Sequence, residues 1–143
     1  MKLKPIMLGT LIIISIISLL VSSCTVDTAI THVDISCEQF QNNDNIQNDF
    51  DVSPGETIII ELCSNPTTGY KWKYETIGKI ILKETSYKFI ESGDTEAIGA
   101  SGKEVWTFEV VETGKTELRM EYTRPWEGGE QAEWTYNVTV TSD

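Results

Sequence analysis

The sequence is poor in histidine, and this shortage argues against catalysis. His32 is the single histidine, and a solitary histidine is more often a surface or packed side chain than a catalytic base. Cys63 and Ser64 are adjacent nucleophile types, but no base is evident that would activate either of them. Acidic residues are dispersed along the chain, so no ligand cluster indicates a zinc or calcium site. We therefore expect neither an enzyme nor a bound cofactor.

Basic residues are also scarce. Lys and Arg number 11 against 22 Asp and Glu, which gives a formal net charge of −11 at pH 7. A surface of this sign repels phosphate backbones, so we do not expect nucleic acid as a partner. An acidic balance can steer a protein toward basic partners, although it serves solubility more often.

The N-terminus has the features of an export signal. Lys2 and Lys4 precede a mostly apolar run, and Val21-Ser22-Ser23-Cys24 follows that run. Small residues before a cysteine resemble the cleavage box of bacterial lipoproteins, so we expect residues 1–23 to be a signal peptide and Cys24 to carry a lipid anchor in the cell envelope. An ordinary signal peptide and an uncleaved anchor are the alternatives, since the run approaches the length of a short membrane span. Residues 24–30 are expected to be a tether.

The sequence contains only three cysteines. If Cys24 takes the lipid, Cys37 and Cys63 remain as a candidate disulfide pair in an oxidising compartment. In the chain-entropy model such a bridge would stabilise the fold by roughly 3 to 4 kcal/mol, provided that the geometry allows it. Two unpaired thiols are the alternative interpretation.

Alternating apolar and polar residues predict short strands along the remaining chain, and helical periodicity is almost absent. The expected strands cover residues 31–37, 46–52, 57–63, 70–76, 79–84 together with 86–91 as one or two strands, 104–111, 116–122 and 133–140. Loops are expected at 41–45 and 92–102. Trp72 fits the core tryptophan of immunoglobulin-like domains. Residues 31–143 are therefore predicted to form an all-β, immunoglobulin-like antiparallel β-sandwich of seven to eight strands, expected as a monomer.

The segment between Ser64 and Tyr70 has the composition of a tightly shaped loop. Asn65 before Pro66 favours extended backbone, the proline fixes φ and removes a donor, and Gly69 permits a positive φ. Two threonines occupy the apex. If successive strands reverse direction, this loop shares one end of the sandwich with the loops at 92–102 and 124–131, and ordinary turns occupy the other end. Loops on a rigid scaffold often carry function, so this end is the predicted binding edge.

Three motifs on these loops resemble those of the chagasin family, proteinaceous inhibitors of papain-type cysteine peptidases. Asn65-Pro66-Thr67-Thr68-Gly69 matches the Asn-Pro-Thr-Thr-Gly signature of that family. Gly99-Ala100-Ser101-Gly102 aligns with its Gly-x-Gly-Gly motif, with Ser101 in place of a glycine. Arg124-Pro125-Trp126 matches its Arg-Pro-Trp or Arg-Pro-Phe motif. The resemblance extends over nearly all of the predicted domain.

The resemblance implies a reversible inhibitor that wedges all three loops into a peptidase cleft. Thr67 and Thr68 would place a hydroxyl or backbone group against the catalytic Cys-His pair. Gly99–Gly102 would allow close backbone approach, because glycine has no Cβ to clash. Trp126 would be an aromatic anchor, and Arg124 would brace its loop or pair with an acidic group on the rim.

Two other functions remain open on the sequence alone. A carbohydrate-binding or adhesion β-sandwich would use Trp126 to stack on sugar, and it would be indifferent to changes at Thr67. A structural envelope domain without a dedicated ligand would lose no binding when any of the three loops is altered. Each motif taken singly also fits an ordinary turn, a flexible glycine segment or a bulge.

Overall fold

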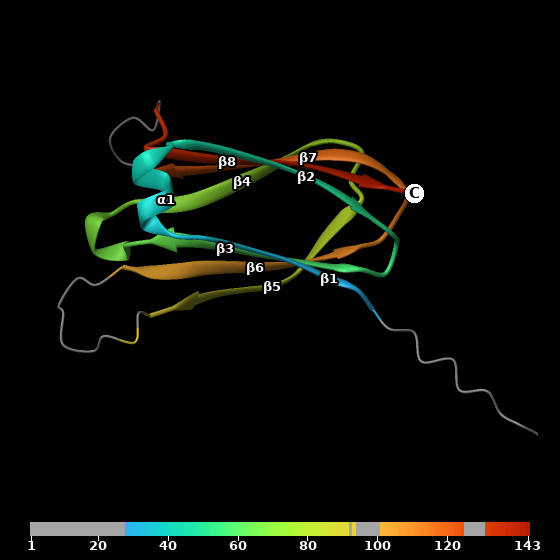
Figure 1. The fold of residues 1–143 in the computed structure, drawn as a ribbon, viewed down its shortest axis with the longest axis horizontal. Helices are drawn as coiled ribbons and strands as arrows, with labels where there is room; N and C mark the ends of the chain where they lie inside the picture. Colours follow the sequence, from blue (N-terminus) through green and yellow to red (C-terminus); the bar gives the residue numbers. More distant parts are fainter. Residues whose placement is uncertain (1–27, 92, 94–100, 125–130) are drawn as a thin grey trace, which may run out of the picture.

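The computed structural model describes residues 28–91, 93, 101–124 and 131–143. Two four-stranded sheets pack face to face, and one short helix covers an end of the sandwich (Figure 1). The strands are β1 (Ile30–Ile35), β2 (Asn45–Val52), β3 (Thr57–Ser64), β4 (Lys71–Gly78), β5 (Leu82–Ile90), β6 (Gly102–Val110), β7 (Gly114–Thr123) and β8 (Trp134–Ser142), and the helix is α1 (Cys37–Asn42).

The strand order is β1-β3-β6-β5 in one sheet and β2-β8-β7-β4 in the other. Four pairings are antiparallel, whereas the β1–β3 and β2–β8 edge pairings are parallel. β1 and β3 run in the same direction because β2, which reverses the chain between them, belongs to the opposite sheet. The predicted all-β, immunoglobulin-like sandwich is confirmed, with one parallel edge pair in each sheet.

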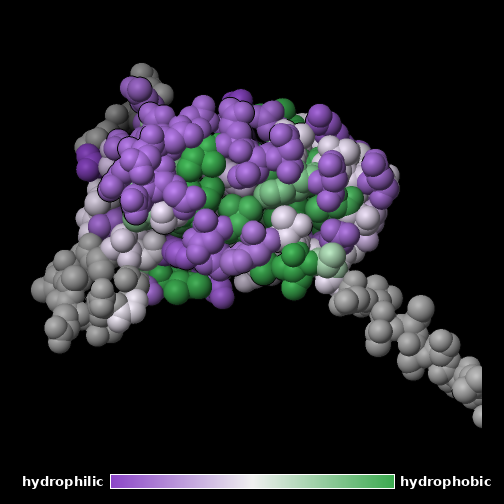
Figure 2. All heavy atoms as spheres, viewed as in Figure 1, coloured by the Kyte–Doolittle hydropathy of each residue, from purple (hydrophilic) through white to green (hydrophobic). Residues whose placement is uncertain are grey.

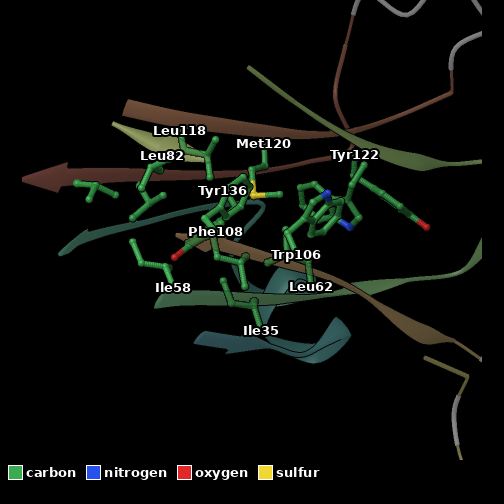
Figure 3. Close-up of a cluster of buried hydrophobic side chains, with 14 of the residues drawn as sticks. Ile35, Ile58, Leu62, Leu82, Trp106, Phe108, Leu118, Met120, Tyr122 and Tyr136 are labelled. Atoms are coloured by element: carbon green, nitrogen blue, oxygen red, sulfur yellow. The ribbon is translucent and has the colours of Figure 1, made fainter. Parts of the chain in front are cut away.

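The core lies between the sheets, where the inward rows of both meet. Alternation along β3 buries Ile58, Ile60 and Leu62, and β8 contributes Tyr136 and Val138 from the other side. Figure 3 shows side chains from both sheets pointing toward one another. Each fully buried aliphatic or aromatic side chain stabilises the fold by about 1.5–3 kcal/mol. Trp72 is only 6% exposed, as expected of a core tryptophan.

Helix α1 corrects the prediction for the segment after β1. Cys37 was expected in the first strand and residues 41–45 in a loop, but residues 37–42 form a helical turn. Ser36 caps it: its Oγ accepts from the backbone N–H of Gln39 at 3.2 Å, and the Gln39 side chain accepts from the Ser36 N–H at 2.8 Å. This capping box satisfies the first helical donors. Phe40, at 1% exposure, buries the helix against the core.

The segments on either side of Thr85 form a single strand, β5, with a register irregularity between Glu84 and Ser86. Gly102, expected in the preceding loop, is instead the first residue of β6. The face seen in Figure 2 is covered mainly by hydrophilic side chains, with smaller hydrophobic areas between them. In the part of the chain that the structure describes, no helix has the length and apolarity needed to span a membrane.

Candidate functional site

The strand ends that flank the three predicted loops lie at one end of the sandwich. In the sheet that contains β3, Ser64 pairs with Gly102, and Ile90 pairs with Lys103. In the other sheet, Lys71 pairs with Thr123 and Tyr122 pairs with Trp134. We call this the loop end, comprising α1, residues 64–70, 101–102, 124 and 133–134. The opposite turn end holds residues 53–56, 79–81 and 111–114, and Figure 1 shows the two ends at left and right.

The loop end contains the expected site residues that the structure describes: Asn65, Pro66, Thr67, Thr68, Gly69, Ser101, Gly102 and Arg124. Gly99, Ala100, Pro125 and Trp126, and the predicted lipid-bearing Cys24, lie outside the described residues.

The Asn65–Gly69 segment is a single 3₁₀ turn, η1 (Pro66–Thr68), held by its own side chains. Asn65 caps the turn, since its Oδ1 accepts from the Thr67 N–H at 3.2 Å. The Gly69 N–H donates to the Pro66 carbonyl at 3.2 Å, and Gly69 adopts a φ of +83°, which favours glycine. The sequence-predicted shaping roles of Asn65 and Gly69 are therefore visible in the backbone.

Both threonine hydroxyls donate within the loop. The Thr67 hydroxyl donates to Asn65 Oδ1 and the Thr68 hydroxyl to the Asn65 carbonyl, each at 2.6 Å. Pro66, Thr67 and Thr68 are nevertheless the exposed residues of the turn. The loop therefore presents backbone, methyl groups and hydroxyl lone pairs to a partner, because the hydroxyl hydrogens are already used.

Three contacts fix the base of this loop. The Asn65 N–H donates to the Tyr122 hydroxyl at 2.8 Å, which joins the loop to β7. Cys63, next to the loop, is bonded to Cys37 of α1 with a Cα–Cα distance of 5.1 Å. The predicted disulfide is thus confirmed. The Trp72 indole N–H donates to the Cys63 carbonyl at 2.8 Å, so the strand that leaves the loop is tied to the strand that enters it.

A column of stacked side chains connects the first and third motifs with the helix. The Arg124 guanidinium lies 4.5 Å from the centroid of the Tyr70 ring, which supports the bracing role expected of this arginine. Tyr70 stacks on Tyr122 at 5.1 Å, and Tyr122 stacks on Trp134 at 4.9 Å. Trp134 in turn stacks on Phe40 of α1 at 5.1 Å. Such contacts each contribute about 0.5–1.5 kcal/mol beyond burial.

Gly102 has a packing role that the sequence did not indicate. A Cβ at this position would meet the Ile90 carbonyl oxygen and, at 2.5 Å, the Phe89 ring. The β5 and β6 ends therefore approach closely where the second loop begins and ends. Ser101, which replaces the family glycine, is exposed and lies next to this contact.

A groove of about 420 Å³ lies between α1, η1 and the start of β8. Thr68, Tyr70, Ser101 and Trp134 contribute to its lining, with Glu133 also in its wall. The Tyr70 hydroxyl and a Glu133 carboxylate oxygen are 3.4 Å apart. Within the described ranges, no group of three or more His, Cys, Asp or Glu side chains could hold a metal ion.

Sequence reasoning missed the residues that hold the loops. Tyr122 and Trp134 were assigned only to strands, and Phe40 was given no role, although the Ser36-x-x-Gln39 spacing is a recognisable capping box. Glu104 also went unnoticed. It occupies an inward position of β6 in a row whose other members, Trp106, Phe108 and Val110, are apolar. A carboxylate at such a position is a readable signal of a buried polar contact.

A β-sandwich that presents a preformed loop edge, held in shape by its own side chains, is typical of proteins that bind a partner through loops on a rigid scaffold. The family model described as chagasin family peptidase inhibitor I42 matches residues 51–140. This chain belongs to the chagasin family of peptidase inhibitors. β1 and α1 precede the matched residues, so the disulfide joins a segment outside the match to the base of the signature loop.

Individual relatives agree with this assignment. The chain is 35% identical over 81 residues to chagasin from Trypanosoma cruzi, covering 54% of this chain and 73% of that protein. It is 28% identical over 92 residues to amoebiasin-2 from Entamoeba histolytica, covering 62% of this chain and 74% of that protein.

Solved structures show the same fold at lower identity. The cysteine protease inhibitor EhICP2 from Entamoeba histolytica superposes with a TM-score of 0.66 at 19% identity, covering 82% of this chain and 98% of that one. PbICP-C, solved in complex with falcipain-2, gives a TM-score of 0.57 at 17% identity, covering 80% and 99%.

Proposed function

We propose that this chain reversibly inhibits papain-type cysteine peptidases by inserting its loop end into the active-site cleft. The observation that carries the proposal is the convergence of the three motif-bearing connections at one end, with η1 already locked in shape. Family membership supports the inhibitory activity. The target class is supported by two proteins of the same fold, a cysteine protease inhibitor and PbICP-C, which was solved in complex with falcipain-2.

The conformation of η1 explains how the loop would block a cleft without being cut. A 3₁₀ turn closed by Asn65 and Gly69 is not an extended substrate strand, so it does not offer a peptide carbonyl in attack geometry. The internally bonded hydroxyls of Thr67 and Thr68 leave little freedom to lose on docking. An interface of ordinary size, roughly 1,600 Å² in total, would then suffice for tight binding.

The remaining motifs would complete the contact on both sides of η1. Gly99–Gly102 would approach the substrate-binding strand of the enzyme, and Trp126 would anchor the far side of the cleft. Arg124, stacked on Tyr70, would hold the start of the third loop in place rather than bind the enzyme.

We also propose that the protein is exported and held in the cell envelope by a lipid on Cys24. Support comes from the place where the described chain begins in the fold. The Ala29 carbonyl accepts from the Thr57 N–H at 3.1 Å, and Ile30 pairs with Thr57, so the described chain begins at the turn end. A tether that precedes β1 would leave the loop end free to meet a peptidase. Mass spectrometry of the membrane fraction tests this, because Cys24→Ala would abolish both the lipid mass and membrane retention.

The inhibitory proposal is tested by titrating papain activity with purified residues 25–143. Trp126→Ala should raise the inhibition constant at least about thirtyfold, as expected for an aromatic hot spot worth 2 kcal/mol or more. Thr67→Ala should raise it less, by removing the hydroxyl that donates to Asn65 Oδ1. Thr113→Ala is the control, since Thr113 is exposed at the turn end. Absence of inhibition at micromolar protein across several papain-type enzymes would refute the proposal.

A further inference from the structure

A buried carboxylate lies directly behind the signature loop. Glu104 is only 5% exposed, and it faces inward from β6 in line with Trp106 and Phe108. Burying a carboxylate is costly unless hydrogen bonds compensate for its lost hydration. Among the described residues no cation pairs with Glu104, since the neighbouring Lys103 pairs with Asp34 and Glu61. An apolar residue would meet the needs of packing alone, so the position calls for a more specific explanation.

The hydrogen bonds of Glu104 lead to both stems of the signature loop. Its Oε1 accepts from the Ser64 hydroxyl at 2.7 Å and from the backbone N–H of Trp72 at 3.5 Å. Ser64 ends β3, and Trp72 is the second residue of β4. These two strands belong to opposite sheets. One carboxylate oxygen therefore bridges the two sheets at the point where residues 65–71 leave and return.

The other carboxylate oxygen is held from a different strand. Oε2 accepts from the Tyr87 hydroxyl at 2.9 Å, and Tyr87 lies on β5 rather than on either stem. The three donors thus divide by role. Ser64 and Trp72 connect Glu104 to the loop, whereas Tyr87 only helps to satisfy the carboxylate.

We propose that Glu104 is a positioning residue for inhibition, one that clasps the two stems of the signature loop and so keeps η1 in its docking shape without touching the peptidase. The proposal rests on the inhibitory function proposed above. If the stems separate, Asn65 and its capped turn sample other conformations. The free-energy cost of ordering them on docking then weakens binding. The clasp acts together with the Tyr122 hydroxyl, which holds the Asn65 N–H from the other side.

Two matched variants separate positioning from simple stability. Ser64→Ala and Tyr87→Phe each remove one hydroxyl donor from Glu104, so both should lower the melting temperature of the full chain, kept soluble in detergent. Only Ser64→Ala releases a loop stem. We expect it to raise the inhibition constant for papain about tenfold, against less than twofold for Tyr87→Phe. Equal increases for the two variants, or no increase for Ser64→Ala, would overturn the proposal.

A second measurement keeps the clasp testable if papain is not inhibited at all, which would refute the proposed function instead. Hydrogen exchange of the Thr68 and Gly69 amides, which donate within the turn, reports the order of the loop directly. Ser64→Ala should speed their exchange at least fivefold relative to wild type, and Tyr87→Phe should leave it unchanged. Unchanged exchange in Ser64→Ala would show that Glu104 does not hold the loop.

Discussion

The two ends of the sandwich are closed by different kinds of contact. At the turn end, most of these contacts are backbone hydrogen bonds. The Gly55 N–H donates to the Val110 carbonyl at 2.7 Å, the Val110 N–H donates to Glu56 at 2.9 Å, and the Val111 N–H donates to Ile81 at 2.8 Å. Side chains of many types are compatible with such contacts, because the donors and acceptors belong to the backbone.

At the loop end, particular side chains make the decisive contacts. The Tyr122 hydroxyl, the Glu104 carboxylate and the Cys37–Cys63 bond each hold the signature loop or its stems. The stacked rings from Tyr70 to Phe40 add a rigid support beneath them. The shape of this end therefore depends on residue identity as well as on the fold.

This difference indicates which end of the sandwich needs a fixed loop conformation for binding. A docking edge gains affinity when its loops are ordered before binding, since ordering them during binding would cost free energy. Substitutions at the turn end should then change stability alone, whereas comparable substitutions at the loop end should change stability and inhibition together.

The largest effect is expected from removing the disulfide. Replacing Cys37 and Cys63 by alanine should lower the free energy of unfolding by about 2–5 kcal/mol, measured by urea denaturation. Inhibition of papain should weaken as well, because Cys63 immediately precedes the Ser64 stem and the bond ties α1 to it. Unaltered inhibition in a folded double variant would show that the helix does not support the loop edge.

Replacing a glycine by alanine at each end, Gly102 at the loop end and Gly55 at the turn end, allows the ends to be compared. Gly102→Ala places a Cβ against the Phe89 ring at 2.5 Å, and such overpacking costs about 1–3 kcal/mol. Gly55→Ala meets nothing within 4 Å and carries only the strain of its φ of +94°, about 1–2 kcal/mol. The inhibition constant should rise several-fold for Gly102→Ala alone. A similar rise for Gly55→Ala would remove the distinction between the ends.

Features that depend on residues close in the sequence could be predicted, and most contacts that hold the loop end could not. Strand positions follow from the local alternation of residues such as Leu118, Met120 and Tyr122, which needs no knowledge of pairing, and the reversal of direction between successive strands was assumed. That information was enough to assign the three motif loops to one end. The caps and turn of Asn65–Gly69 were predictable for the same reason, because their contacts span only a few residues.

The contacts that hold the loop end are not local. Tyr122 meets Asn65 across 57 residues, and Glu104 meets Ser64 across 40. Which tyrosine reaches the loop depends on the strand register between and within the sheets, and a pattern of alternating residues does not specify it. Helix α1 was missed for another reason: its single turn is too short for helical periodicity, so the capping box was the only local signal.

Two buried tyrosines on neighbouring strands provide a smaller and cleaner test. Tyr122→Phe leaves the Asn65 N–H without its hydroxyl acceptor, at an expected cost of about 1–3 kcal/mol. The Tyr136 hydroxyl is buried without a hydrogen-bond partner among the described residues, so Tyr136→Phe should be neutral or slightly stabilising. Inhibition of papain should weaken several-fold in the first variant only. Equal inhibition by both variants would show that the Tyr122 hydroxyl does not shape the edge.

The smallest effect concerns alkaline pH, where we expect Tyr87, which donates to Glu104, and Tyr74, in the middle of β4, to behave alike. Burial, followed by hydrogen bonding to Glu104, raises the pKa of Tyr87 to about 12, and burial with Glu84 raises the pKa of Tyr74 to about 12. The unfolded chain ionises near the ordinary pKa of about 10, so it releases these protons first, and stability should fall as pH rises from about 10 to 12. Melting temperatures across this range should decline less steeply in both Tyr87→Phe and Tyr74→Phe. A flatter decline in Tyr87→Phe alone would mean that the surroundings of Glu104 and the middle of the sandwich differ in charge as well as in shape.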